Sequence, residues 1–346
     1  IALLQYTGGT TGKSKAAILT HKNLLSNVQQ VSNWIEPHIK PGEEIIITAL
    51  PLFHIFSFTV NCLTFLKIGA ENVLIANPRD LKSFLKVLKK KKFTVMTAVN
   101  TLFNLLLTSK TFKELNFSSF KFSVGGGMAV MSETAKNWKK VTGTNITQGY
   151  GLTETSPVVS INKIDSLYNG SIGLPVQSTN IKIIDENGGK INDKQPGELC
   201  VKGPQVMSGY WKYPEDQENP FTDDGFFKTG DIASISDHGY LTIVDRKKDM
   251  IISSGYNVFP NEIEDYLSTH PDILEAGVIG IPDKNRGEYI KAFVVKKNKN
   301  LIDTEVITYC KEGLTDYKVP KKVIFIDDLP KTNVGKILRR ELRNFD

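Results

Sequence analysis

Apolar residues recur at helical spacing in two segments of the first half of the chain. After Thr20, which is suited to capping a helix, the i, i+4, i+7 rhythm predicts an amphipathic helix with one apolar face. That face consists of Leu24, Leu25, Val28, Val31 and Ile35. A second helix is predicted to open at Asp80, with an inward face of Leu81, Phe84, Leu85 and Leu88.

Short apolar runs alternate with these helical patterns. Residues 94–98, 121–124 and 145–148 are typical of buried strands, and strands that alternate with helices predict an α/β fold with a layered, mostly parallel sheet. From about Ser171 the strand-like runs become shorter, and residues 185–188 (DENG) and 236–239 (SDHG) are typical of hairpin turns. We therefore expect a small antiparallel barrel or sheet at the end of a large domain.

The last hundred residues alternate again. Pro260 suits the first turn of a helix that carries Ile263 and Leu267, and residues 276–281 and 291–295 resemble strands. A chain of 346 residues exceeds the usual size of one domain. We expect a large domain over residues 1–245 and a small, mobile α+β domain over residues 246–346.

Residues 45–66 are apolar enough to imitate a membrane span. Pro51, His54 and Asn61 interrupt the stretch, which favours short core strands and helices instead. No signal peptide is recognisable, and we expect a cytoplasmic protein. Peripheral contact at the inner face of the membrane is left open.

Composition narrows the choice of partners. The formal net charge of +6 suits anionic small molecules without requiring nucleic acid. Cys62, Cys200 and Cys310 are far apart in the sequence, with neither the paired spacing of a zinc site nor the pattern of a disulfide framework.

The strongest chemical signal is residues 6–15 (YTGGTTGKSK). Glycines allow backbone N–H groups to face an anion, and the hydroxyl and ammonium groups of this segment add donors and charge, so it predicts a polyphosphate site. The Walker loop matches except for one residue, because its spacing requires glycine where Thr7 stands. A glycine- and threonine-rich turn without a ligand remains the alternative for this segment alone.

Further motifs follow in a fixed order: residues 125–128 (GGGM), 148–154 (QGYGLTE), 228–231 (KTGD), 245–249 (DRKKD), 254–256 (SGY) and 330–337 (PKTNVGKI). Together with the first loop, this series resembles the adenylate-forming superfamily of acyl-CoA synthetases over the whole chain. Residues 5–9, 122–127 and 333–343 resemble in particular the bacterial long-chain fatty-acid–CoA ligases. Relatives carry an extended region before the first loop, so we expect that this chain, which begins at Ile1, lacks it.

The resemblance implies an AMP-forming acid–thiol ligase. Such an enzyme adenylates a medium- or long-chain fatty acid with ATP and Mg²⁺, then transfers the acyl group to coenzyme A. Oligomerisation is left open. Two other functions also stay open: an aryl-acid CoA ligase, and a shortened AMP-binding module without turnover. A P-loop motor or GTPase is disfavoured by the missing Walker spacing.

By the same resemblance, the nucleotide is bound by Thr7, Thr10, Thr11, Lys15, Gly126, Gly127, Tyr150, Asp231 and Arg246. Tyr150 is expected at the adenine and Asp231 at the ribose, whereas Glu154 would hold Mg²⁺ and Thr153 would contact phosphate. Each has a simpler alternative. Thr153 and Glu154 could merely open a helix, Tyr150 could serve the core, and Arg246 could be exposed beside Asp245 or Asp249.

Lys336 is the expected catalytic cation of adenylation, on a loop that enters the site. Lys248 matches the hinge of the family, and Gly255 and Tyr256 match its coenzyme A segment. His54 would line the acyl entrance as an orienting group, although a core histidine is the simpler interpretation. The basic runs 89–92 and 339–340 are interpreted as solvated helix ends, with contact to phosphate as the alternative.

Overall fold

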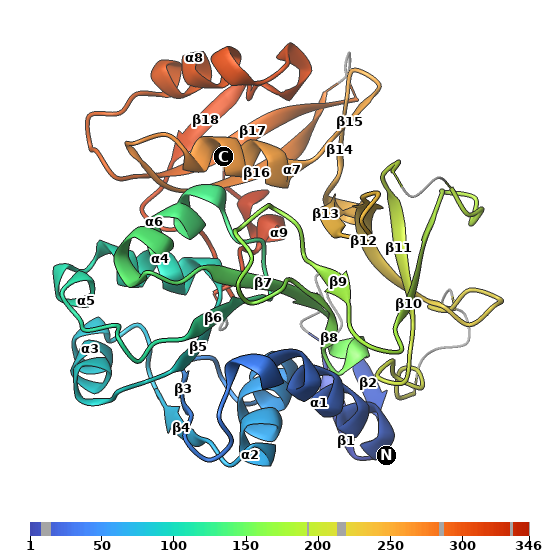
Figure 1. The fold of residues 1–346 in the computed structure, drawn as a ribbon. Helices are drawn as coiled ribbons and strands as arrows, with labels where there is room; N and C mark the ends of the chain where they lie inside the picture. The colour runs from blue at the N-terminus through green and yellow to red at the C-terminus, as the bar shows by residue number, and fades with distance from the viewer. Residues whose placement is uncertain (8–14, 192–193, 213–218, 284–286, 333–334, 346) are drawn as a thin grey trace. The chain divides into compact units, whose positions relative to one another are not determined.

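The computed structural model describes residues 1–7, 15–191, 194–212, 219–283, 287–332 and 335–345 (Figure 1). These residues form two compact units. The first contains residues 1–130, 134–229 and 234–242, and the second contains residues 131–133, 230–233 and 243–346. The domain boundary expected after residue 245 remains a prediction.

The first unit is built on a seven-stranded sheet of order β4-β3-β5-β6-β7-β8-β9. Neighbouring strands from β4 to β7 are parallel, whereas β8 and β9 are antiparallel additions. The bounds are β3 (Ile45–Thr48), β4 (Glu71–Leu74), β5 (Val95–Ala98), β6 (Phe122–Gly125), β7 (Ile146–Gly151), β8 (Val158–Ile161) and β9 (Leu174–Pro175). The predicted layered, mostly parallel α/β fold is confirmed.

Helices cover this sheet, which lies between α4 and α6 on one side and α1 and α2 on the other (Figure 1). Their bounds are α1 (His21–Ile35), α2 (Phe65–Lys67), α3 (Leu81–Lys90), α4 (Asn100–Thr108), α5 (Lys110–Lys113) and α6 (Ser132–Thr142). The core between sheet and helices includes an edge-to-face pair of Phe103 and Trp138, with ring centroids 4.7 Å apart. Such pairs add about 0.5–1.5 kcal/mol beyond the burial of their area.

The two predicted helices begin as expected. The Thr20 hydroxyl accepts a hydrogen bond from the backbone N–H of Asn23, and the Asp80 carboxylate accepts one from Ser83. The prediction for Leu25 was wrong, because its side chain is 66% exposed. Leu25 lies about 100° around the helix from Leu24 and so outside the stripe that faces the core.

The apolar stretch of residues 45–66 becomes β3, a π-helix (Ser57–Thr64) and the start of α2. Asn61 in its middle is buried: its amide nitrogen donates to Thr48 and its amide oxygen accepts from Thr97, at 3.0 and 2.9 Å. Strand side chains thus satisfy the polar groups of the stretch. Among the described helices, none has the length and hydropathy needed to cross a membrane.

Two smaller sheets complete this part of the chain. β1 (Leu3–Tyr6) and β2 (Ala16–Leu19) form an antiparallel pair, and β10 (Asn180–Ile184), β11 (Gly197–Lys202), β12 (Phe227–Ile235) and β13 (Leu241–Arg246) form a four-stranded sheet in that order. The expected turns are present, since Gly188 donates to the Asp185 carbonyl and Gly239 to that of Ser236. Of the two expected forms, the described hydrogen bonds give a sheet with β10 and β13 at its ends.

The second unit is an α+β unit with a five-stranded sheet. Its strands β15, β14, β17 and β16 follow one another, and β18 pairs with β17 in parallel. The bounds are β14 (Ile251–Ser253), β15 (Tyr256–Val258), α7 (Pro260–Ser268), β16 (Ile273–Asp283), β17 (Gly287–Lys296), α8 (Asp303–Gly313), β18 (Lys322–Phe325) and α9 (Arg339–Leu342). Pro260 occupies the first turn of α7, as predicted, and Ile263 and Leu267 are fully buried.

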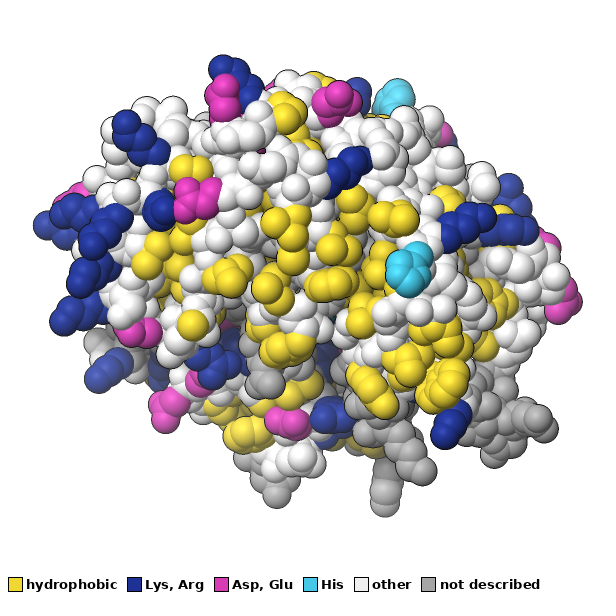
Figure 2. All heavy atoms as spheres, turned by 90° about the horizontal axis from the view of Figure 1, so that it is seen from below, with side chains coloured by type: hydrophobic (Ala, Val, Ile, Leu, Met, Phe, Trp, Pro, Cys, Tyr) yellow, Lys and Arg dark blue, Asp and Glu magenta, His cyan; other side chains and the backbone are white. Residues whose placement is uncertain are grey.

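One face of the molecule carries a broad area of hydrophobic side chains (Figure 2). It is the face seen from below in Figure 1, where α1, α2, β1 and β4 lie. Exposed apolar side chains on these elements are Tyr6, Leu25, Leu66 and Leu74. Of these four residues, Leu25 was predicted to face the core, and it instead contributes to the exposed hydrophobic surface of this unit.

Candidate active site

The two ends of the glycine- and threonine-rich loop are held together. The backbone N–H of Thr7 donates to the carbonyl of Lys15 at 2.7 Å, directly beyond the paired residues Tyr6 and Ala16. Thr10 and Thr11 of the predicted site lie outside the described residues. The β1–β2 pair therefore fixes where this loop leaves and re-enters the sheet.

Lys15 and Glu154 lie near one tyrosine that sequence reasoning missed. The hydroxyl of Tyr210 donates to Oε1 of Glu154 at 2.7 Å, and Nζ of Lys15 lies 5.2 Å from the centroid of the Tyr210 ring. We define Lys15, Glu154 and Tyr210 as the Tyr210 cluster. Tyr210, which lies 56 positions after Glu154 in the sequence, thus contacts two of the predicted site residues, Lys15 and Glu154.

Glu154 lies just after the end of β7, in a three-residue 3-10 turn (Thr153–Thr155). Its side chain belongs to a residue that is only 9% exposed, and its backbone carbonyl accepts from the N–H of Met207 at 2.7 Å. The alternative for Thr153 and Glu154 was that they only begin a helix. The helical segment that they begin is a single 3-10 turn. Thr153 itself is half-buried beside Glu154.

Glu154, held by Tyr210, suits a magnesium ion that is bound together with a phosphate substrate. Mg²⁺ needs only one or two protein carboxylates when phosphate oxygens and water complete its shell, and the Glu154 carboxylate is held in place by the Tyr210 hydroxyl. Groups of three or more His, Cys, Asp or Glu side chains placed to hold a metal are not found within the described ranges. An ion held by protein side chains alone is thus not indicated there.

The predicted adenine segment lies at the ends of β6 and β7. A Cβ on Gly126 would lie 3.3 Å from the Phe56 ring, and Gly127 has a φ of +78°, which side chains rarely adopt. Tyr150 is half-buried in β7, opposite Ser160 of β8. Gly126 thus lies in a tightly packed position and Gly127 in a conformation that favours glycine, at the strand end where the adenine is expected.

His54 lies at the start of the helical segment that follows β3. Its Nδ1 accepts a hydrogen bond from the backbone N–H of Phe56 at 3.3 Å, and its ring is half-buried. An accepting Nδ1 implies that the neutral ring carries its proton on Nε2. This arrangement fixes the direction of the ring, as an orienting group requires, and equally suits a structural histidine.

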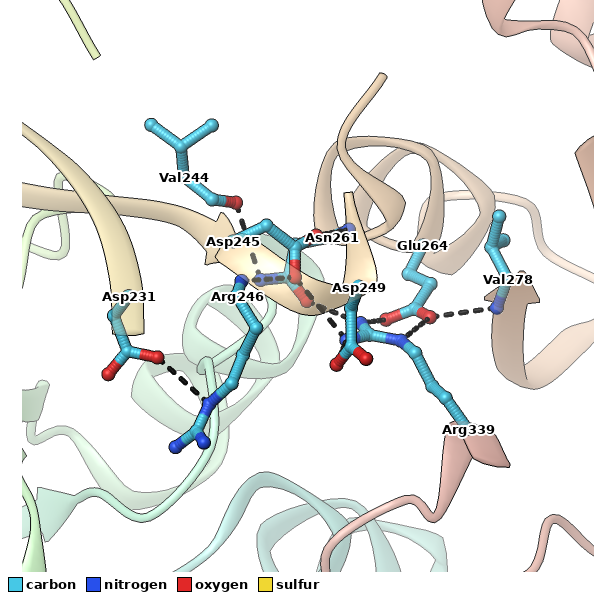
Figure 3. A network of polar contacts seen from close by, with 9 residues as sticks. All are labelled: Asp231, Val244, Asp245, Arg246, Asp249, Asn261, Glu264, Val278 and Arg339. Carbon is cyan, nitrogen blue, oxygen red and sulfur yellow. Dashed lines mark hydrogen bonds and ion pairs between the residues drawn. The ribbon is translucent and has the colours of Figure 1, made fainter. Parts of the chain in front are cut away.

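In the second unit, Asp231, which was expected at the ribose, forms an ion pair with Arg246, which was also expected to bind the nucleotide. Nε of Arg246 lies 2.8 Å from Oδ1 of Asp231, and the Asp231 side chain is almost fully buried (Figure 3). Asp231 belongs to β12 and Arg246 ends β13. The guanidinium of Arg246 thus forms an ion pair with Asp231, while its backbone N–H donates to the neighbouring Asp245 at 2.7 Å.

Lys336 joins these two residues electrostatically. Burial lowers the pKa of Lys336 to about 8, and the charges of Arg246 and Lys248 act in the same direction, whereas Asp231 raises it. Two hydrogen bonds to Thr332 hold the backbone of Lys336: the Thr332 N–H donates to the Lys336 carbonyl, and the Lys336 N–H donates to the Thr332 hydroxyl. Four predicted residues, Asp231, Arg246, Lys248 and Lys336, therefore influence one another within this unit.

Arg339 corrects one sequence interpretation. It was expected to be a solvated helix end, yet its side chain is only 17% exposed. The guanidinium donates to Glu264 at 2.7 and 3.1 Å, to Asn261 at 2.6 Å, and to Asp245 and Asp249 at 3.4 Å (Figure 3). Arg340 is exposed, as expected, and so are Lys89 and Lys90 in the last turn of α3.

Asp245 and Glu264 explain why Arg339 is buried. Asp245 also accepts from the backbone N–H groups of Arg246 and Asn261, and Glu264 accepts from that of Val278. Burial raises the pKa of Asp245 to about 6, although Arg339 lowers it. These residues therefore join α9 to the predicted hinge segment around Lys248 and to α7.

The predicted coenzyme A segment is a two-residue hairpin turn between β14 and β15. Ser254 and Gly255 have φ of +54° and +80°, the signature of a type I′ turn. Tyr256 is exposed, and its ring stacks on Tyr317 at 4.5 Å between centroids. A Cβ on Gly255 would meet no atom within 4 Å, so the residue needs its backbone freedom and also leaves open space.

Comparison with known proteins gives the family. A model of the AMP-binding enzyme family matches residues 1–211, and a model of the AMP-binding enzyme C-terminal domain matches residues 262–336. The long-chain-fatty-acid–CoA ligase of Escherichia coli O6:H1 is 53% identical over 99% of this chain. The chain spans 61% of the length of that relative.

Solved structures agree in fold. ATP-bound MatB from Rhodopseudomonas palustris is 32% identical, with a TM-score of 0.87 over 98% of this chain and 67% of that one. The anthranilate CoA ligase AuaEII in complex with anthranoyl-AMP is 26% identical, with a TM-score of 0.90 over 99% of this chain and 66% of that one. The resemblance to adenylate-forming acyl-CoA synthetases is confirmed, and the chain belongs to the AMP-binding enzyme family.

Proposed function

We propose that this chain carries out the chemistry of an ATP-dependent acyl-CoA synthetase for medium- or long-chain fatty acids. The carboxylate oxygen attacks the α-phosphorus of ATP, the bond to the β-phosphate oxygen breaks, and pyrophosphate leaves. The thiol sulfur of coenzyme A then attacks the carbonyl carbon of the acyl-adenylate, AMP leaves, and the thiol proton passes to solvent. The products are acyl-CoA, AMP and pyrophosphate.

The observation that carries the proposal is the grouping of Asp231, Arg246, Lys248 and Lys336 in one unit. Adenylation needs little from a protein beyond positioned positive charge, since charge shifts onto phosphate oxygens in the transition state. Lys336 is a long, mobile point charge suited to the α-phosphate. Asp231 is short and held by Arg246, which suits acceptance from two ribose hydroxyls.

The remaining predicted residues take the roles that the family resemblance gives them. Lys15 and Thr7 flank the phosphate loop, with Thr10 and Thr11 expected within it, while Thr153 would contact phosphate. Tyr150, Gly126 and Gly127 would form the adenine platform, and His54 would orient the carboxylate. Glu154 would hold Mg²⁺, which supplies charge neutralisation for the triphosphate.

For the second step, we propose rotation of the small domain about Lys248. The Ser254–Gly255 turn would then replace Lys336 at the reacting carbonyl and admit the pantetheine arm beside Tyr256. The turn is preformed, with an open side at Gly255. Hinge rotation of this kind requires only a few residues to change φ and ψ.

The fatty-acid assignment rests on the 53% identity to the E. coli ligase. The structural neighbour that binds anthranoyl-AMP keeps an aryl acid as the alternative. We further propose a cytoplasmic location, with exposed lysines at the end of α3 available for peripheral contact with membrane phosphate. Sedimentation with anionic vesicles, in the parent and in a Lys89→Glu/Lys90→Glu variant, tests that contact.

The test of the function uses a panel of acids with the protein expressed from its complete reading frame. Exchange of labelled pyrophosphate into ATP reports adenylation, and mass spectrometry of the thioester reports transfer to coenzyme A. Dodecanoate and hexadecanoate should support both reactions, whereas anthranilate and ferulate should support neither. Activity with aryl acids alone would establish the aryl-acid alternative, and AMP binding without exchange would establish a binding module.

A further inference from the structure

Tyr210 has no role in the motif series, yet it contacts two residues assigned to the triphosphate. Its hydroxyl donates to Glu154 Oε1 at 2.7 Å, a normal length for a charge-assisted hydrogen bond. The same ring lies under Lys15, at a distance where a cation and an aromatic face attract. One side chain therefore contacts both the expected metal carboxylate and the expected phosphate cation.

The backbone fixes Tyr210 independently of these two contacts. Residues 208–211 pair with β2: the N–H of Ile18 donates to the Gly209 carbonyl at 2.9 Å, and the N–H of Trp211 donates to the Ala16 carbonyl at 2.8 Å. Gly209 adopts a φ of +141°, a conformation that side chains rarely adopt. This extra strand-like segment places Tyr210 beside β2, whose first residue follows Lys15 directly.

Glu154 is fixed from the same segment. Its backbone carbonyl accepts from the N–H of Met207, three residues before Tyr210. The main chain and the carboxylate of Glu154 are thus both bound by residues 207–210. Because Glu154 is largely buried, a carboxylate that lost its donor there would be free to turn away or would remain unsatisfied.

We propose that Tyr210 is a positioning residue for the metal–triphosphate site, a role that rests on the function proposed above. Its hydroxyl holds one oxygen of the Glu154 carboxylate, which would leave the other oxygen available to a divalent cation. Its ring holds the ammonium of Lys15 near the same carboxylate. The site then meets the metal and the phosphate charge with groups already in place, which lowers the cost of ordering them on binding.

The test measures metal binding rather than turnover. Mn²⁺ replaces Mg²⁺ as the probe, and its free concentration is followed by electron paramagnetic resonance in the presence of a saturating non-hydrolysable ATP analogue. Tyr210→Phe removes the hydroxyl and keeps the ring. Residues that orient a metal ligand typically contribute 10–100-fold to affinity, so the Mn²⁺ dissociation constant should rise about 10-fold.

The matched control is Tyr168→Phe in the same unit. Its hydroxyl also donates a hydrogen bond, to the backbone carbonyl of Val130, but lies in the core cluster rather than beside Glu154. This variant should bind Mn²⁺ as the parent does. Tyr210→Leu, which also removes the ring from Lys15, should weaken the ATP analogue itself in addition to the metal.

The outcomes separate this proposal from the proposed function. Equal Mn²⁺ affinity in Tyr210→Phe and parent would overturn the positioning role while leaving the synthetase chemistry intact. Equal losses in Tyr210→Phe and Tyr168→Phe would assign the effect to general destabilisation and also overturn it. A parent that binds neither the analogue nor Mn²⁺ would overturn both proposals together.

Discussion

The guanidinium of Arg246 lies 2.8 Å from the carboxylate of Asp231, and this pair joins two strands whose motifs are separate in the sequence. Asp231 was expected at the ribose and Arg246 among the residues that bind the nucleotide, so the pair would hold a short acidic side chain ready for two hydroxyl groups. The carboxylate is almost fully buried, so removing Arg246 would leave a buried negative charge without this cation. We therefore expect a change at either residue to weaken nucleotide binding.

Replacing Asp231 with Asn removes the charge and keeps the size of the side chain. We expect the Michaelis constant for ATP to rise about 10-fold with a smaller change in kcat, because the ribose contacts are made in both ground and transition states. Asp237→Asn is the control, since Asp237 forms an exposed ion pair with Lys194 in the turn after β12. Identical ATP dependence in Asp231→Asn and parent would remove Asp231 from the ribose site.

Arg339 is expected to be the main electrostatic support of the hinge segment. Arg339→Met leaves the buried carboxylates of Asp245 and Glu264 without their cation, so the free energy of unfolding should fall by about 3–5 kcal/mol. Arg340→Met, next along the same helix but exposed, should change it by less than about 1 kcal/mol. Urea denaturation of both variants tests the difference, and equal stabilities would refute the structural role of Arg339.

The lowered pKa of Lys336 predicts a basic limit for adenylation. A cation is needed at the α-phosphate, so kcat/KM for adenylation should decline as the pH rises through about 8 and the ammonium of the free enzyme loses its proton. Lys336→Arg, slower but always charged, should show no such limb. A parent profile that stays flat to pH 10, or the same limb in both proteins, would contradict the assignment.

The lowered pKa of Lys336 has the opposite effect on stability: it increases the free energy of unfolding as the pH rises. The unfolded chain binds the Lys336 proton with a pKa near its ordinary 10.5, more tightly than the folded chain at about 8. Between these values the unfolded state holds more protons, so Lys336 makes the protein more stable as the pH rises. Loss of activity above pH 8 should therefore occur without unfolding of this region, which circular dichroism at each pH can verify.

The sequence predicted elements well where local pattern decides structure. Thr20 and Asp80 begin helices because their side chains accept from the next turn, and Pro260 opens α7 because it needs no donor there. The prediction for Leu25 was wrong because Leu25 fits the spacing of the apolar residues, although it lies about 100° around the helix axis from Leu24, outside the buried stripe. Local spacing cannot say which of two adjacent leucines faces the core.

Long-range partners were harder to foresee. Motif order placed Asp231, Arg246 and Lys336 among the site residues, but nothing in their spacing indicated that the guanidinium of Arg246 pairs with Asp231. Arg339 looked like a solvated end because its carboxylate partners lie 75 to 94 positions earlier. Tyr210 gave one weak signal, a glycine before two aromatic residues, and needed the fold to bring Glu154 to it.

Substitutions of Gly255 in the hairpin turn should impair thioester formation and leave adenylation unchanged. Gly255→Leu places a bulky group on the expected pantetheine path and strains a turn with φ of +80°, so thioester formation from acyl-adenylate should fall while adenylation continues. Gly255→Asn is the control for strain, because asparagine tolerates positive φ with a smaller side chain. If both variants retain the parent rate of thioester formation, the segment lies off the coenzyme A path.

The most direct test of the two-step account is Lys336→Ala measured in each half-reaction separately. Adenylation, followed as fatty-acid-dependent pyrophosphate exchange, should fall by ~10²–10³-fold, as expected for the loss of a group that stabilises transition-state charge. Supplied with synthetic acyl-adenylate and coenzyme A, the same variant should form thioester at close to the parent rate. Equal losses in the two half-reactions would contradict the account and leave Lys336 as a general binding or structural residue.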